Sequence, residues 1–291
     1  MKYGVIILNY LAYSDTINCV NDFLSQSLKK DDELRIVVVD NNSYNESYEK
    51  LQEAFKKIEN VDIIKTEKNL GFANGNNLGY EYLKKYHCDF YIISNDDILI
   101  KDKGLFSWIS SEYESSKFAV LGPDIYAPKI KMHQNPNPNK TDNRYLRLLL
   151  FHYQQKLKYF YIKINPFYSK KEIYFDSGEI YKNQSDNITL HGAFQIFSKV
   201  YFEKYNEPYD SRTFLYAEED LLKLRCMSSG LKMLYSPTFT VEHLQETATN
   251  IVNKNNNRKK LLFRLKHSIK SFKIYLKELK KYLKKQKGEK L

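Results

Sequence analysis

The chain has 291 residues, enough for one large α/β domain or two small ones, and 42% apolar residues provide for a real core. Its three cysteines are far apart and form no CxxC pair, which argues against a disulfide framework or a structural zinc site and predicts a reducing cytoplasmic location. No window reaches the roughly 18 apolar residues of a membrane span, and the N-terminus lacks signal-peptide features, so we expect a soluble or peripheral protein.

The net charge of +11 is concentrated at the C-terminal end. Residues 254–291 contain fifteen Lys or Arg and two Glu, so the preceding residues together carry about −2. A nucleic-acid groove would need cations in the body of the protein, and we therefore predict no nucleic-acid partner.

Apolar runs and helical spacings alternate through the first 95 residues. Strands are predicted at 3–8, 34–39, 61–66 and 90–94, and helices at 14–28, 46–58 and within 69–86. Ser14 or Asp15 is the expected cap of the first helix. This order predicts a mostly parallel sheet with helices on both faces.

The rest of the chain has a less regular pattern. We predict a strand at 118–125, a loop at 133–143, a basic aromatic helix at 144–164 and an irregular insertion at 170–190. Residues 191–205 pass from a tight turn into a strand or helix. A helix within 210–237 ends at Gly230, and residues 231–244 form two short strands around Pro237.

Three of the predicted strands end in polar side chains, at Asn9, at Asp40 and at Asn95 to Asp97. Ligands bind outside the carboxyl ends of strands in an open parallel sheet, so we expect these side chains to converge. Each alone could be only a cap or a turn former. The acids after Asn95 could bind Mg²⁺ or Mn²⁺ together with diphosphate oxygens, and His243 could add an imidazole, which suits Mn²⁺.

Two further segments are candidates for chemistry. Residues 69–79 place three glycines four apart, which is not the dinucleotide fingerprint but lets backbone approach a ligand closely. Residues 217–220 begin a helix with three acids. Acids complement the dipole of a first helical turn, and one that faces a cleft is also a good general base.

Seven segments resemble, in their order, glycosyltransferase family 2 and its rhamnosyltransferase-like branch, over roughly residues 3–245. They are VIILNY, VVVDNNS, NLGFANGNNLG, SNDDI, HGAFQIF, FLYAEEDLLKLR and VEH. The resemblance implies a GT-A fold, a Rossmann-like α/β sheet, with a nucleotide-sugar half in residues 1–120 and an acceptor half in 121–250. It implies metal-dependent, inverting transfer from dTDP-rhamnose or a UDP-sugar to a polysaccharide or lipid-linked glycan.

The resemblance also implies roles for single residues. Asp97 would be the metal-binding acid, with His243 as the late histidine of the family. Asp96 stands where the family has proline, which leaves open whether it touches ribose or metal. The other donor contacts would come from Asn9, Asp40, Asn69, Gly71, Asn77 and Asn95.

On the acceptor side, the resemblance implies a turn formed by His191, Gly192, Ala193 and Phe194. The catalytic base position falls on Glu219, with Glu218 as the open alternative. Two other functions stay open: a sugar nucleotidyltransferase, whose early Arg-containing glycine loop is missing here, and a non-catalytic membrane-tethered binding protein.

The basic tail, residues 251–291, is predicted to be an amphipathic helix. Its apolar side chains alternate three and four apart at Leu262, Leu265, Ile269, Phe272, Leu276, Leu279 and Leu283. The flanking lysines disfavour a homodimeric coiled coil and favour anionic lipid. We therefore predict that residues 258–291 bind the inner face of the cell membrane, with self-association or packing on the body as the alternative. Residues 144–164 are a candidate for a second lipid or acceptor contact.

Overall fold

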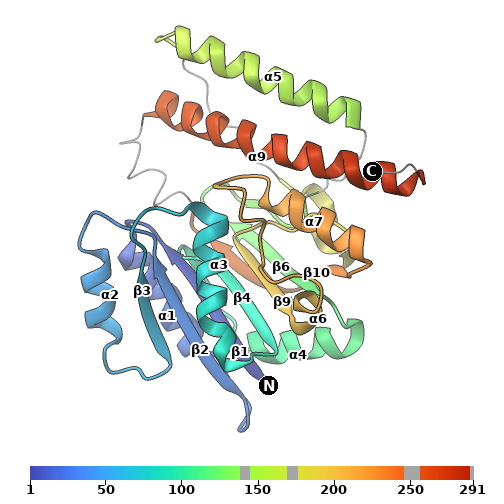
Figure 1. The fold of residues 1–291 in the computed structure, drawn as a ribbon. Helices are drawn as coiled ribbons and strands as arrows, with labels where there is room; N and C mark the ends of the chain where they lie inside the picture. The colour runs from blue at the N-terminus through green and yellow to red at the C-terminus, as the bar shows by residue number, and fades with distance from the viewer. Residues whose placement is uncertain (138–144, 169–175, 246–255, 289–291) are drawn as a thin grey trace.

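A ten-stranded sheet lies at the centre of this computed structural model, which describes residues 1–137, 145–168, 176–245 and 256–288. Along the main path of the sheet the strand order is β3-β2-β1-β4-β9-β6-β10-β5 (Figure 1). Parts of the predicted loop at 133–143, of the predicted insertion at 170–190 and of the tail lie outside the described residues.

The first half of the sheet is parallel, as the alternating pattern predicted. Its β-branched runs are buried on both faces, which suits strands covered by crossover helices. The strands are β1 (Lys2–Asn9), β2 (Glu33–Asp40), β3 (Val61–Lys65) and β4 (Phe90–Asn95). The helices between them are α1 (Tyr13–Leu24), α2 (Ser47–Phe55) and α3 (Gly71–Leu83), followed by a 3-10 turn (Lys84–Tyr86).

The second half inserts an antiparallel strand, β9, between β4 and β6. Its strands are β5 (Ile98–Leu99), β6 (Val120–Ala127), β7 (Met132–His133), β8 (Ser185–Asp186), β9 (Phe194–Ser198) and β10 (Met233–His243). Its helices are α4 (Leu105–Ser116), α6 (Lys199–Phe202) and α7 (Glu218–Ser229), with a 3-10 turn at Gly178–Lys182.

Alternate side chains of each strand enter different cores. Val5 and Ile7 of β1 pack with α1, α2 and α4, whereas Ile6 packs with α3 and α7. The period of two in a strand explains this division. The sheet is therefore a central layer between two helical layers, and both cores are hydrophobic.

Three local predictions differ from the structure. Helix α1 ends at Leu24, and neither Ser14 nor Asp15 caps it, because the cap position is Ala12. Residues 233–243 form one strand, not two; its pairing with β6 shifts register between Tyr235 and Thr240. Pro237 lies in that interval and has no N–H to donate, so it interrupts the ladder without ending the strand.

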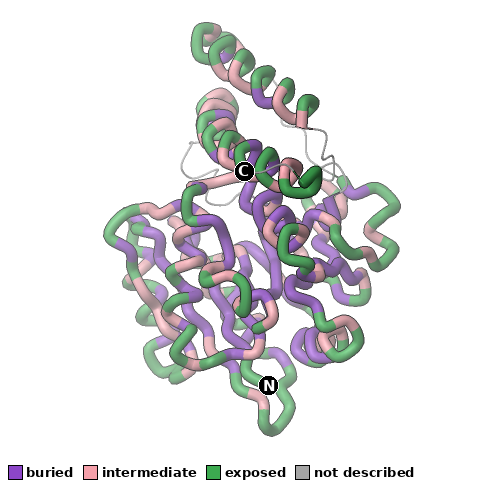
Figure 2. The backbone as a smooth tube through the Cα atoms, turned by 45° about the vertical axis from the view of Figure 1, so that its right-hand side comes forward, coloured by how far each residue is buried: buried purple, intermediate pink, exposed green. Residues whose placement is uncertain are grey.

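Two long helices, α5 (Tyr145–Ile164) and α9 (Asn257–Gln286), form a layer beyond the sheet (Figure 1). Leu279 of α9 packs in one cluster with Leu221 and Leu224 of α7. The opposite side of α9 contacts α5, which is the outermost helix (Figures 1 and 2). The apolar seam predicted to meet lipid is thus covered by the protein itself. Among the described helices, none has the length and apolar character needed to cross a membrane.

His152 makes the α5–α9 contact sensitive to pH. It is buried on α5 against Phe272 of α9, with ring centroids 6.0 Å apart. Burial lowers the pKa of His152, and the charges of Lys156 and Lys273 lower it further. The folded protein therefore holds this imidazole neutral, whereas the unfolded chain binds a proton as the pH falls through about 6.5.

We expect acid to weaken the folded state through this residue. Lowering the pH from about 7.5 to about 5.5 should reduce the melting temperature more in the wild type than in His152→Leu, which has no proton to bind. Melting curves of both proteins at the two pH values measure the difference. Equal pH dependence in the two proteins would show that His152 contributes nothing.

Candidate functional site

The carboxyl ends of β1, β2 and β4 bring the predicted polar residues together. The register pairs Asn9 with Asp40, and Leu8 with Asn95. The Asn9 amide donates to Asp40 Oδ1 at 2.7 Å, and Thr16 Oγ1 donates to Asn9 Oδ1 at 2.9 Å. Both Asn9 and Asp40 are fully buried. The edge of the sheet therefore carries a fixed polar pair.

A second polar group holds the glycine-rich loop against this edge. The Asn41 side chain accepts from the Leu70 N–H at 2.8 Å and donates to the Gly71 carbonyl at 3.2 Å. Asn69 Oδ1 accepts from the Gly71 N–H at 2.9 Å. Asn69 and Gly71 thus lie beside the end of β2, and their contact with a donor stays a prediction. Asn41 was not predicted, although it directly follows Asp40 in the sequence.

Gly71 is required by both its backbone angle and its surroundings. Its φ is +78°, and an added Cβ would lie 2.1 Å from the Phe214 carbonyl oxygen. That carbonyl accepts the Phe72 N–H at 2.7 Å, so the loop and residues 210–216 are held in direct contact. No side chain fits at this position without moving backbone.

Gly71→Ala is expected to cost several kcal/mol of unfolding free energy, beyond the about 1–2 kcal/mol of a left-handed backbone angle. Gly178→Ala is the matched control, because Gly178 has φ +61° and nothing within 4 Å of its added Cβ. Urea unfolding of both variants separates the steric cost from the backbone cost. Equal losses would show that the Phe214 contact is easily relieved.

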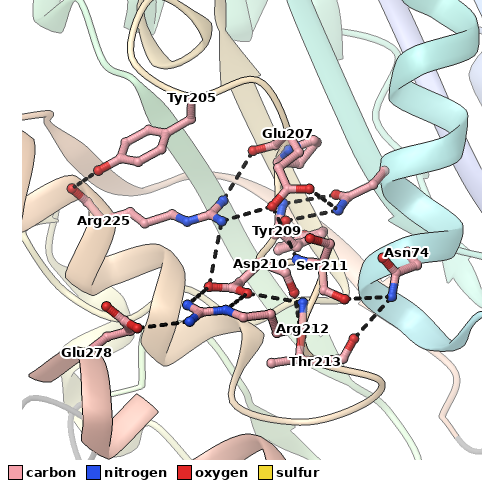
Figure 3. A network of polar contacts seen from close by, with 12 residues as sticks. Asn74, Tyr205, Glu207, Tyr209, Asp210, Ser211, Arg212, Thr213, Arg225 and Glu278 are labelled. Atoms are coloured by element: carbon pink, nitrogen blue, oxygen red, sulfur yellow. Dashed lines mark hydrogen bonds and ion pairs between the residues drawn. The ribbon is translucent and has the colours of Figure 1, made fainter. Parts of the chain in front are cut away.

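The predicted donor residue Asn77 is used inside the protein. It donates to the Tyr209 carbonyl at 2.9 Å and accepts the Tyr209 N–H at 3.0 Å. Asn74, one turn earlier, donates to the Ser211 carbonyl at 3.0 Å (Figure 3). Both asparagines of α3 therefore position residues 207–213. A contact of Asn77 with the donor stays a prediction.

An ion-pair network continues this support towards α7 and α9 (Figure 3). Arg212 contacts Asp210 at 2.6 Å and Glu278 of α9 at 2.9 Å. Arg225 of α7 contacts Glu207 at 3.1 Å. Burial alone would raise the pKa of Asp210, but the hydrogen bonds from Arg212 outweigh it and lower that pKa. The segment before α7 is consequently fixed by charged contacts to two helices.

Glu219 lies in the first turn of α7, next to the turn that precedes β9. Its Oε1 accepts the Gly192 N–H at 2.6 Å. An added Cβ on Gly192 would lie 3.3 Å from that oxygen, so a small residue is favoured there. Glu219 is half-buried, whereas its neighbours Glu218 and Asp220 are buried. The more accessible Glu219 is the better placed of the two candidate bases.

Asp97 and His243 are also in contact, on the other side of the turn that precedes β9. His243 Nε2 lies 3.3 Å from Asp97 Oδ1, and its Nδ1 lies 2.7 Å from Gln134 Oε1. An amide oxygen only accepts, so Nδ1 carries a proton and Nε2 faces the carboxylate. Gln134 is a supporting residue that the loop sequence gave no means to identify.

Three acidic side chains, Asp15, Asp96 and Asp97, influence one another near His243. Burial raises the pKa of Asp96 well above its usual value, and the charges of Asp97 and Asp15 add to that effect. Burial also opposes ionisation of Asp97, but the hydrogen bond and charge of His243 outweigh it and lower the pKa of Asp97. Asp97 is therefore the carboxylate that stays ionised beside the imidazole.

The side chains of Asp97 and His243 fit a divalent cation only in part. Carboxylate oxygen and imidazole nitrogen suit Mn²⁺, and the N–H of His243 is oriented by Gln134 as in many metal sites. Among the described residues, however, no group of three or more His, Cys, Asp or Glu side chains is arranged for a metal. Asp97 and His243 would need further ligands from water and a bound diphosphate.

His191 lies between the Asp97–His243 pair and Glu219. Its ring centroid lies 5.7 Å from that of His243, and its Nδ1 accepts the Ala193 N–H at 3.1 Å. Gly192, the next residue, donates to Glu219. The Ala193 carbonyl in turn accepts the Asn95 N–H at 2.8 Å. The predicted acceptor-side turn thus lies between Asp97 and Glu219, and Phe194 begins β9 in the core.

A groove of about 700 Å³ is lined by residues of β6, β7 and β10 together with Tyr181 and Lys182. Its lining includes a hydrogen-bonded pair, His133 Nδ1 and Asp124 Oδ1 at 2.8 Å, and Tyr181 stacked on His133. Gln134, which contacts His243, is the residue after His133. The groove was not predicted, because its residues come from segments far apart in the sequence.

The mixed α/β sheet and its acidic edge define the class of protein as a GT-A fold. Three solved structures share the fold, although low identity limits the likeness to the fold alone. S. aureus TarS 1-349 has 13% identity and a TM-score of 0.55, covering 98% of this chain and 72% of that chain. The same protein with UDP-GlcNAc has 14% identity, a TM-score of 0.53, and coverages of 84% and 59%. Mannosyltransferase PcManGT from Pyrobaculum calidifontis, in complex with GDP-Man and Mn²⁺, has 10% identity, a TM-score of 0.56, and coverages of 99% and 76%.

The sequence profile described as "Glycosyl transferase family 2" matches residues 4–205, and the chain belongs to this family. It is therefore a glycosyltransferase, which confirms the predicted family, fold and enzyme class. This assignment favours transfer over the nucleotidyltransferase and the non-catalytic alternatives. No curated protein sequence matches the chain.

Proposed function

We propose that this glycosyltransferase moves a sugar, with inversion, from a nucleoside-diphosphate sugar to a glycan acceptor. The observation that carries the proposal is the continuous set of contacts from Asp97 through His243 and His191 to Glu219. In this proposal the cation-binding side chains and the base lie on either side of the turn formed by His191 to Phe194. The resemblance to the rhamnosyltransferase-like branch makes dTDP-rhamnose or a UDP-sugar the donor to test first.

In this proposal Glu219 removes the proton of the acceptor hydroxyl. The freed oxygen bonds to the anomeric carbon as the bond from that carbon to the diphosphate breaks, and the proton passes from Glu219 to solvent. The Gly192 N–H keeps the carboxylate pointing at the turn. Glu218, buried at the start of α7, is the less accessible alternative.

The donor is proposed to lie along the edge formed by Asn9, Asp40 and Asn95, with the loop of Asn69 and Gly71 over it. Residues 1–120 are then the nucleotide-sugar half and 121–250 the acceptor half. Asp97 and His243 would hold a Mg²⁺ or Mn²⁺, which would neutralise charge on the departing diphosphate. PcManGT, a structure of similar fold, is a complex with GDP-Man and Mn²⁺, which supports testing this cation first.

The acceptor is proposed to be a polysaccharide or a lipid-linked glycan of the cell envelope, used at the inner face of the membrane. The basic character of α5 and α9 supports such a location. The groove beside His133 is proposed as a path for an acceptor chain, because His133 directly precedes Gln134, which contacts His243.

A thermal-shift panel of UDP, dTDP and GDP sugars with Mn²⁺ tests the donor, followed by a hydrolysis assay on each sugar that binds. We expect stabilisation by one nucleotide class and slow release of its diphosphate. Stabilisation by none of them, with the protein folded, would contradict the proposed donor class.

A further inference from the structure

The outer face of α5 exposes a continuous apolar stripe. Six of its side chains, or of the residues just after it, are more than 60% exposed: Leu146, Leu150, Leu157, Phe160, Ile164 and Phe167. Most lie three or four residues apart, so they share one side of the helix. The inner side is occupied by His152 and Ile162, which are buried. An exposed apolar surface of this extent on a soluble domain marks an interaction site.

The charge of the same helical layer is one-sided. Helix α5 contains Arg147, three lysines and no acidic residue. Helix α9 beside it contains twelve Lys or Arg and a single Glu, Glu278, which is engaged by Arg212. The rest of the chain is close to neutral, so the layer is a local cationic surface.

These charges decide between two kinds of occupant. A second copy packed stripe to stripe would bring cations against cations, with no acid on either α5 to offset them. An anionic lipid surface takes up apolar side chains among its acyl chains and attracts the surrounding lysines with its headgroups. Tyr153 and Tyr161, which are exposed on this helix, are of the type enriched at the boundary between the two regions.

We propose that the outer face of α5, and not the seam of α9, docks this glycosyltransferase on an anionic membrane. This refines the proposed membrane location but rests on its own contacts, since no donor, acceptor or cation takes part in the docking. Helix α9 joins the docked helix to α7, where Glu219 lies, and His267 of α9 contacts Phe214 with ring centroids 4.7 Å apart. Docking through α5 therefore places the membrane beside the layer that adjoins the catalytic segment.

Vesicle co-sedimentation of the full chain tests this docking. We expect binding to vesicles with about one third phosphatidylglycerol, and weak binding to pure phosphatidylcholine. Leu157→Gln combined with Phe160→Gln should weaken binding by about tenfold or more, because both side chains are exposed on the stripe. Leu28→Gln combined with Ile58→Gln, two exposed apolar residues elsewhere, is the matched control and should bind as the wild type does.

The charge component has its own pair of variants. Lys158→Glu with Lys163→Glu should abolish binding to the anionic vesicles, whereas Lys29→Glu with Lys30→Glu, an equal change of charge at exposed sites far from α5, should not. Equal binding of the stripe variant and its control would overturn the proposal. So would a dimer, seen by sedimentation velocity without vesicles, that the Leu157→Gln, Phe160→Gln protein does not form.

Donor hydrolysis in solution separates this inference from the proposed function. The stripe variant should hydrolyse the nucleotide sugar at the wild-type rate while failing to bind vesicles. Vesicle binding by the wild type without any nucleotide response would support the docking and contradict the donor class. If the stripe variant lost both hydrolysis and vesicle binding, the assignment of the stripe to docking alone would be overturned.

Discussion

Glu219→Gln is expected to lower the turnover of sugar transfer by about 10²–10⁴-fold while nucleotide binding persists. Glutamine has the size of glutamate and its oxygen can still accept the Gly192 N–H, but it cannot take up a proton. Turnover is measured as release of the nucleoside diphosphate in the presence of acceptor, and binding as the thermal shift with the nucleotide. Turnover close to that of the wild type would exclude Glu219 as the base.

Two comparisons complete this experiment. Glu203→Gln changes an exposed glutamate outside the site and should leave turnover unchanged. Glu218→Gln changes the buried neighbour of Glu219 and should lower thermal stability more than turnover. The opposite pattern, with turnover lost only in Glu218→Gln, would transfer the role of base to Glu218.

Asp97→Asn is expected to reduce transfer by about 10³-fold or more, since charge neutralisation at a departing diphosphate is worth several kcal/mol. Asparagine keeps the shape of the side chain but removes the charge that faces His243 Nε2. The thermal shift produced by nucleotide with Mn²⁺ should also disappear, which distinguishes lost cation binding from a general loss of activity.

The control for Asp97 is Asp31→Asn, at an exposed position away from the site. In the wild type, EDTA should abolish transfer and added Mn²⁺ should restore it. Full activity in EDTA would remove the cation from the mechanism, and Asp97 would then be a partner of His243 only.

Much of the fold was predictable because its signals are local. The β-branched runs of β1, β2 and β4 specify buried strands, and Gly230 ends α7 with φ +65° as its position indicated. The pairing of β9 between β4 and β6 was not predictable, since a five-residue apolar strand has the same composition in either direction. The heptad spacing of α9 identified an apolar seam correctly, but spacing does not name the partners, and these are α7 and α5.

The candidate site was also predictable only in part. Asn9, Asp40 and Asp97 could be placed because parallel strands end at one edge. Gln134, which orients His243, and Asn41, which holds the Gly71 loop, lie in polar segments where many residues would have looked equally suitable. The preference for Glu219 over Glu218 needed burial and the contact with Gly192, because adjacent acids in a first turn are equivalent in sequence.

The packing of α9 on α7 has a consequence for how the protein can be divided. A chain cut before residue 256 would leave Leu221 and Leu224 bare on the helix that begins with Glu218 and Glu219, and Arg212 would lose one of its two carboxylates. We therefore expect such a shortened enzyme to aggregate and to bind its donor poorly, whatever its affinity for lipid. Deleting the tail would therefore alter the packing of α7 and the contacts of Arg212 as well as any binding to lipid.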